Sequence, residues 1–80
     1  MQIPVIKKLV ETYKIEELQA AEAAILEEEN PEIEVEGKDE GEQLTHVIAA
    51  IFIINDMEKN GNEFRVALRN YTQKVRKSIS

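Results

Sequence analysis

The chain of 80 residues contains no cysteine and only one histidine. Without cysteine there can be no disulfide, no thiolate nucleophile and no cysteine-ligated zinc site. One histidine is too few for the usual clusters of nitrogen ligands, so we expect neither a metal nor another cofactor. Very small domains commonly gain stability from disulfides, metals or oligomerisation. Of these three, association between copies is the one left.

Basic residues and long apolar stretches are also scarce. Ten lysines and arginines against sixteen aspartates and glutamates give a net charge of −6 at pH 7. This charge argues against nucleic-acid binding, because phosphate neutralisation needs a basic surface. No stretch approaches the roughly 20 apolar residues of a membrane span, and the amino terminus MQIPVIKKLV has no signal-peptide pattern. We therefore expect a cytoplasmic protein that binds neither nucleic acid nor membrane.

What is present predicts a single helical domain over residues 1–80, because the length allows one core and no second one. Pro4 suits the first turn of a helix over about residues 4–13. A second apolar pattern, from Ile15 to Leu26, lies in a segment rich in alanine and glutamate, which are strong helix formers. Pro31 then disfavours helical geometry at the residue before it and is expected to end this helix.

Two further helices are predicted in the second half of the chain. Asp39 and Glu42 resemble a capping box that begins the third helix, which runs to Asn60 and Gly61. Asn62 can cap a fourth helix, whose apolar stripe continues to the carboxyl end. The expected fold class is therefore all-α: a small four-helix domain, orthogonal or bundle-like, with one short extended segment.

The extended segment is residues 32–36, EIEVE, between Pro31 and Gly37. Polar and apolar residues alternate strictly there, with the β-branched Ile33 and Val35 at the apolar positions, as in a half-buried strand. The chain offers no second strand. The segment therefore either remains an extended loop or pairs with its copy in another subunit through Ile33 and Val35.

The third helix carries more apolar surface than one chain is expected to cover. Its run VIAAIFII, from Val47 to Ile54, is longer than two helical turns, and a helix that is apolar on every side must be covered on every side. One face can pack on the other helices, and we expect the second to meet its own copy in a symmetric homodimer. The alternative is that the other three helices enclose the third completely. The expected self-association face comprises His46, Ala49, Ala50, Phe52, Ile53 and Met57.

Charges are segregated along the chain. Residues 27–42 include nine acidic residues and one lysine, whereas the last helix has five basic residues and no acidic one. Arg65, Arg69 and Arg76 fall on one side of that helix, where they could hold an anionic ligand or an acidic partner. The alternative is that they face the acidic segment of their own subunit or of a neighbour.

Two polar residues fall where apolar residues are expected: Glu22 on the apolar face of the second helix, and Asn55 inside the main face of the third. A buried carboxylate needs a close cation or a proton, and either condition is common at functional sites. Glu22 and Asn55 are therefore a possible buried polar site. Alternatively, Glu22 lies at the edge of the contact and Asn55 fixes the packing register. The one acid–base pair that can be assembled is Glu22 with His46, and we expect no enzyme.

The stretches IPVIKKLVETY, IEELQAAEAAILEE and DEGEQLTHVIAAIFII, with ALRNYTQKVRKSIS at the end, resemble a family of small uncharacterised proteins from Bacteroidetes-type bacteria. The resemblance covers nearly the whole chain and implies a domain of unknown function. Together with the surplus apolar face, it leads us to expect a non-enzymatic accessory or interaction protein that acts as a homodimer. The alternative is a small protein that binds an anionic ligand between subunits.

Overall fold

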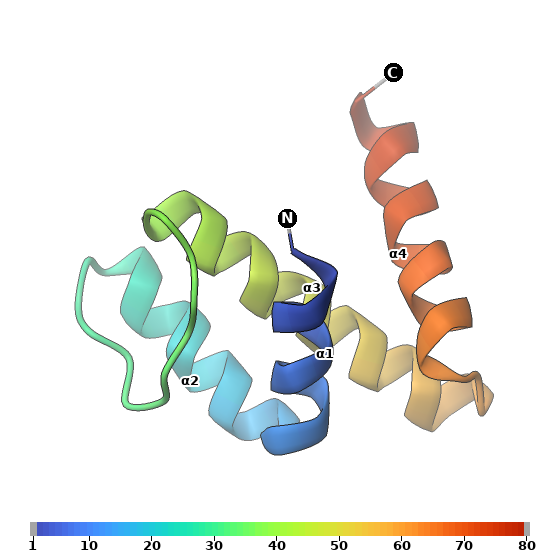
Figure 1. Ribbon diagram of the computed structural model, residues 1–80, viewed down its shortest axis with the longest axis horizontal. Coiled ribbons are helices and arrows are strands. Elements are labelled where there is room, and N and C mark those ends of the chain that lie inside the picture. Colours follow the sequence, from blue (N-terminus) through green and yellow to red (C-terminus); the bar gives the residue numbers. More distant parts are fainter. Residues whose placement is uncertain (1, 80) are drawn as a thin grey trace.

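The computed structural model describes residues 2–79, and in that range the chain forms four helices and no strand, which confirms the all-α fold. Helix α3 crosses the molecule, and the other three helices pack on it (Figure 1). Helix α2, with the loop that follows it, lies toward one end of the molecule, α4 lies at the other, and α1 lies between them. None of the described helices is long and apolar enough to cross a membrane. The helices are α1 (Ile3–Thr12), α2 (Ile15–Leu26), α3 (Glu40–Asn60) and α4 (Phe64–Ile79).

Asp39 and Gly61 cap the two ends of α3, as predicted, although Glu42 reaches back to Lys38 rather than to Asp39. Asp39 Oδ1 accepts a hydrogen bond of 2.8 Å from the N–H of Glu42, and Glu42 Oε1 accepts one of 3.1 Å from the N–H of Lys38. Gly61 ends the helix in the left-handed conformation, with φ of 66°, which costs glycine far less than other residues. These caps and the length of the segment make the apolar run VIAAIFII part of a helix rather than a buried strand.

Helix α2 ends at Leu26, so Pro31 is not the residue that ends it. Glu28 adopts a left-handed φ of 61°, its N–H donates to the carbonyl of Ile25, and the N–H of Glu29 donates to the carbonyl of Ala24. This pair of bonds is the Schellman arrangement that closes many helices. A glutamate at the left-handed position is unusual, which is why the sequence pointed to Pro31 instead. The turn leaves Leu26, which was predicted to share the core face, 64% exposed.

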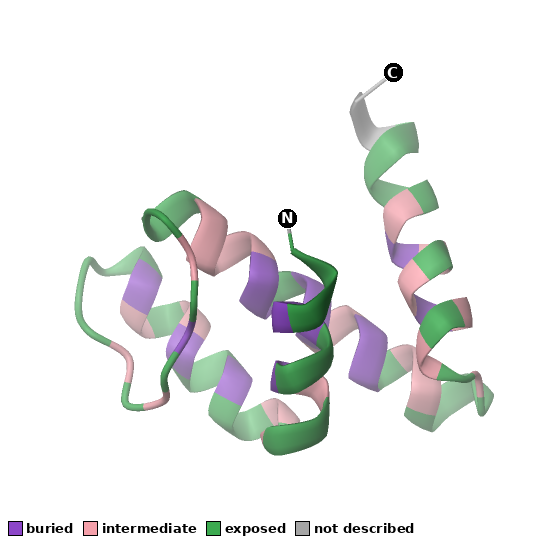
Figure 2. Cartoon of the chain, viewed as in Figure 1, coloured by how far each residue is buried: buried purple, intermediate pink, exposed green. Residues whose placement is uncertain are grey.

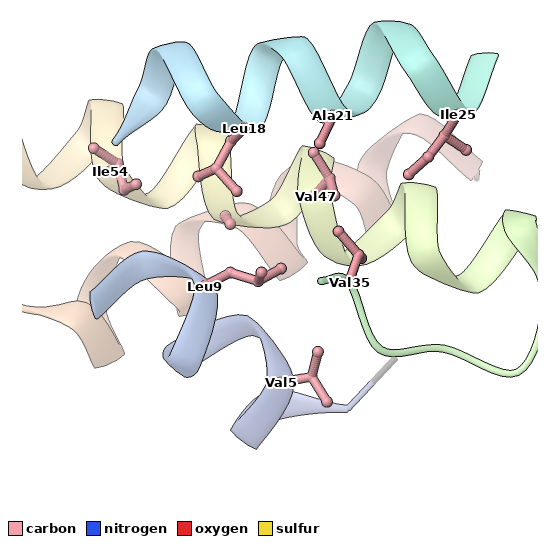
Figure 3. Close-up of a cluster of buried hydrophobic side chains, with 9 residues drawn as sticks. Val5, Leu9, Leu18, Ala21, Ile25, Val35, Val47 and Ile54 are labelled. Atoms are coloured by element: carbon pink, nitrogen blue, oxygen red, sulfur yellow. The ribbon is translucent and has the colours of Figure 1, made fainter. Parts of the chain in front are cut away.

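The apolar core consists of two clusters on different sides of α3. Figure 3 shows the first, in which side chains of α1, α2 and the α2–α3 loop converge on α3. The second lies between α1, α3 and α4. The first cluster comprises Val5, Leu9, Leu18, Ala21, Ile25, Val35, Val47, Ala50 and Ile54. The second comprises Ile6, Ala49, Ile53, Ala67 and Tyr71.

The predicted self-association face of α3 is covered by the chain itself, which corrects that prediction. The members with no exposed surface are His46, Ala49, Ala50 and Ile53. Phe52 and Met57 are half-buried and pack against the second cluster. The reason is that α1 contributes to both clusters, with Ile6 in the second, while α4 covers the remaining side. The structure is closer to the alternative, because the other three helices bury most of α3, although they leave Ile48 and Asn55 exposed.

Residues 32–36 form no strand with any other part of the described chain, and pairing with a second copy through Ile33 and Val35 stays a prediction. The predicted alternation is nevertheless present, because Val35 is buried in the first cluster, Ile33 packs against it half-buried, and the three glutamates are exposed. A lone extended segment has no ladder partner in its own chain. Its apolar side chains therefore gain most by entering the core of the same molecule.

Candidate functional site

Helix α4 is packed on the body of the domain along only part of its length. Its buried residues are Ala67 and Tyr71, and beyond them the described side chains are mostly exposed (Figure 2). The ring of Tyr71 contacts that of Phe52, with centroids 5.5 Å apart, and Lys74 Nζ lies 5.1 Å from the centroid of the Phe52 ring. Burial raises the pKa of the Tyr71 hydroxyl. The helix is thus anchored near Tyr71, and its last turns extend away from α1 and α2 (Figure 1).

An apolar edge separates the buried face of α4 from its arginines. At helical spacing, Leu68 and Val75 lie on the side of Tyr71 that leads toward Arg69 and Arg76. Leu68 is half-buried, Val75 is 38% exposed, and both arginines are exposed. We call Leu68, Arg69, Val75 and Arg76 the α4 flank. It is a mixed apolar and basic surface that adjoins the core without being covered by it.

The three predicted arginines align on one side of α4, as expected. Arg65 makes an exposed ion pair with Glu63, at 3.6 Å between Nε and Oε2, of a kind that contributes little to stability. A hollow of about 420 Å³ beside α4 is lined by Asn70, Gln73, Lys74 and Lys77 rather than by the arginines. This hollow therefore gives no support to an anion site built from Arg65, Arg69 and Arg76 within one chain.

The acidic segment lies at the opposite end of the molecule from α4 (Figure 1). Between α2 and the loop that follows it runs a groove of about 460 Å³. Three alanines of α2 and Ile33 give this groove an apolar lining, and four glutamates give it negative charge: Glu16, Glu17, Glu29 and Glu32. We call it the acidic groove. One alternative expected the arginines of α4 to face the acidic segment of their own subunit. They do not, because the two lie at opposite ends of the molecule.

The predicted buried polar site is not formed. Asn55 is exposed, because it shares with Ile48 the strip of α3 that the other helices leave uncovered. Glu22 is half-buried at the side of α2, which agrees with the alternative that it lies at the edge of a contact. Asn55 was predicted to lie on the main face of the helix because it directly follows Ile54, which is buried there.

His46 has a structural role, through partners that the sequence did not reveal. It is completely buried, its Nδ1 lies 2.8 Å from the carbonyl oxygen of Glu36, and its Nε2 lies 3.0 Å from the backbone nitrogen of Gln2. Because a backbone N–H can only donate and a carbonyl can only accept, the proton sits on Nδ1 and the ring is neutral. His46 thereby joins α3 to the start of α1 and to the end of the α2–α3 loop.

A second polar cluster joins α3 to α4 around Asp56. The carboxylate accepts hydrogen bonds from the side-chain amides of Asn60, Asn62 (3.1 Å) and Asn70 (2.9 Å). Asn62 was predicted to cap α4, but its amide points to Asp56 instead, and α4 begins at Phe64. The bonds from Asn70, Asn60 and Asn62 lower the pKa of the Asp56 carboxyl. Within the described residues, three asparagines from the end of α3, the turn and α4 thus meet one carboxylate.

We expect Asp56 to make the stability of the fold sensitive to acid. Since its pKa is lower in the folded chain than in the unfolded one, its contribution is complete above the unfolded pKa near 4 and is lost as the pH falls through the lower folded value. Asp56→Asn resembles the protonated carboxyl. The difference in urea midpoint between wild type and Asp56→Asn should therefore shrink between about pH 5 and pH 2.5.

The matched control is Glu58→Gln, which removes the same charge from an exposed position two residues away on the same helix. A difference between wild type and Asp56→Asn that stays constant over this pH range would show that the three amide bonds do not favour the charged form of Asp56.

Comparison with known proteins places the chain by its family. No curated protein and no solved structure matches it. The sequence profile described as "Family of unknown function (DUF6952)" matches residues 1–80, which is the whole length of the chain. The family resemblance found in the sequence is thus confirmed as to a small domain of unknown function. The chain belongs to this family of unknown function, DUF6952.

Proposed function

We propose that the chain is a non-enzymatic accessory protein that acts by binding protein, and that it does so as a homodimer. The observation that carries the proposal is the α4 flank. The helix continues to Ile79, well past its anchor at Tyr71, and bears an exposed Val75 beside arginines. Apolar side chains next to arginine are typical of protein-binding surfaces, where arginine is enriched relative to lysine.

The surroundings of His46 support a role without acid–base catalysis. Both ring nitrogens are engaged by backbone groups, and the side chain has no exposed surface. A general base must reach the proton that it removes, and His46 has neither a free nitrogen nor access to solvent. The pairing of Glu22 with His46 that an enzyme would need is therefore not supported.

The distribution of charge supports association between copies. Each molecule carries an acidic groove at one end and a basic helix at the other (Figure 1). Surfaces of opposite charge on separate molecules attract one another and raise the rate of productive encounter. The homodimer is therefore proposed from the distribution of charge, and no longer from the face of α3 that the chain itself buries.

Light scattering coupled to size-exclusion chromatography tests the homodimer. We expect a molar mass of twice the 9.2 kDa of one chain at micromolar concentration and low salt. A constant mass of 9.2 kDa up to the highest soluble concentration would contradict the homodimer.

A thermal-shift screen with phosphate, nucleotides and carboxylates separates this proposal from the binding of an anionic ligand. Protein binding through the α4 flank predicts no specific shift, whereas a saturable rise in Tm that Arg69→Ala removes would favour the ligand.

A further inference from the structure

We propose that the α4 flank of one copy docks in the acidic groove of a second copy, and that the same contact is made in return. Two chains then form a closed dimer with two identical contacts. The inference rests on the proposed homodimer and names the surfaces through which it forms. The flank has apolar and basic side chains, and the groove has an apolar and acidic lining, that the rest of the same chain does not cover.

The α4 flank needs an apolar and acidic partner. Val75 is exposed on the same side of the helix as Leu68, which is only half-buried. Arg69 and Arg76 continue that side of the helix into solvent. A surface that buries Val75 must bring negative charge to these arginines, because burying them without partners is costly.

Pairing of α4 with its own copy does not meet this need. Helix α4 carries five basic residues and no acidic one. Two such helices side by side would place like charges together in an interface, where their repulsion opposes association. The partner surface must therefore come from another part of the molecule.

The acidic groove has the matching composition. Ala20 is exposed and Ala24 is half-buried, so the backbone of another helix can approach α2 closely there, and Ile33 offers an apolar contact for Val75. Glu16, Glu29 and their neighbours surround this lining with carboxylates for the arginines. Residues 11–42 as a whole contain thirteen acidic residues and two lysines, so the region around the groove is also negative.

The chain cannot satisfy both surfaces by folding on itself. Helices α2 and α4 lie at opposite ends of the molecule, and α3 and α1 lie between them (Figure 1). The complementary charges can therefore meet only between molecules. Because every copy has one flank and one groove, a two-fold arrangement satisfies both at once and closes the assembly. A one-way contact would instead build open chains.

A charge exchange between two double variants tests the contact. Arg69→Glu/Arg76→Glu makes the flank acidic, and Glu29→Lys/Glu32→Lys makes the groove more basic. Each variant alone brings like charges together at both contacts, so we expect its dissociation constant to rise at least tenfold in sedimentation velocity. In an equimolar mixture the changed flank meets the changed groove and the two native surfaces meet each other. The mixture should therefore form dimers with an affinity within a few-fold of wild type.

Two controls keep the result specific. All four changed side chains are exposed, so each variant should keep the helical circular dichroism spectrum of wild type. Lys7→Glu/Lys59→Glu makes the same change in net charge as the flank variant, at exposed positions on α1 and α3, outside both proposed surfaces. This control variant should remain a dimer.

The outcomes distinguish the contact from the homodimer itself. A wild-type chain that is a monomer would overturn the homodimer and the contact together. A wild-type dimer that both double variants retain, or that the mixture fails to restore, would overturn the contact and leave the homodimer standing. Wild-type assemblies that grow beyond a dimer with concentration would overturn the closed two-fold arrangement.

Discussion

Replacing Ile53 with alanine is expected to lower the free energy of unfolding by about 2–5 kcal/mol. The side chain has no exposed surface and belongs to the cluster in which α1, α3 and α4 meet. Removing three carbons there loses their transfer free energy and leaves a cavity that two other helices would have to move to fill. The loss is a large share of the roughly 4–12 kcal/mol expected for a domain of this length.

Urea denaturation followed by circular dichroism measures this change, and the matched control is Ile48→Ala on the same helix. Ile48 is 38% exposed on the uncovered strip of α3, so its truncation should cost about 1 kcal/mol or less. If Ile53→Ala proves too unstable to study, Ile53→Val should cost about 0.5–1.5 kcal/mol. Equal effects of Ile53→Ala and Ile48→Ala, with loss of dimer in the former, would return Ile53 to a self-association face.

The four helices could be predicted because their signals are local. Asp39, Glu42 and Gly61 fix the ends of α3 through hydrogen bonds and backbone conformations that involve only neighbouring residues. The end of α2 was predicted too late in the chain. The left-handed residue that ends it is Glu28, whereas glycine or asparagine is the residue type that marks such a position in a sequence.

The covering of α3 could not be predicted because it depends on where short helices pack. Counting apolar residues suggested that too little of the chain remained to enclose the run VIAAIFII. The structure covers most of this run because α1, only ten residues long, contributes to two clusters, with Val5 in one and Ile6 in the other. Adjacent residues on a helix point in different directions, so each can pack in a different cluster when the helix lies between the two.

The candidate site was predicted in part. Helical spacing placed Arg69 and Arg76 on one side of the last helix, and the structure retains that alignment. The acidic groove could not be predicted, because it is formed by α2 and a loop without regular structure that is held in place by Val35. The partners of His46 were also hidden, since they are backbone groups, which carry no residue-type signal.

Replacing His46 with phenylalanine is expected to cost about 2–4 kcal/mol, although the ring volume is kept. The N–H of Gln2 loses its acceptor and the carbonyl of Glu36 loses its donor. Each backbone group that is left unsatisfied out of water costs about 1–3 kcal/mol. Because Gln2 precedes the first turn of α1, the loss should fall mainly on the docking of that helix and of the loop before α3, which amide hydrogen exchange can resolve.

The conservative variants separate the two bonds. His46→Asn retains a donor near the position of Nδ1, and His46→Gln retains an acceptor near that of Nε2, so each should be more stable than His46→Phe. Nitrogen chemical shifts of the wild-type ring report its protonation directly, and we expect a proton on Nδ1 and none on Nε2 at neutral pH. Shifts averaged between the two tautomers would mean that the ring is not held by Gln2 and Glu36. A cost no larger for His46→Phe than for His46→Asn would mean that the packing of the ring, rather than its two hydrogen bonds, holds α1 to α3.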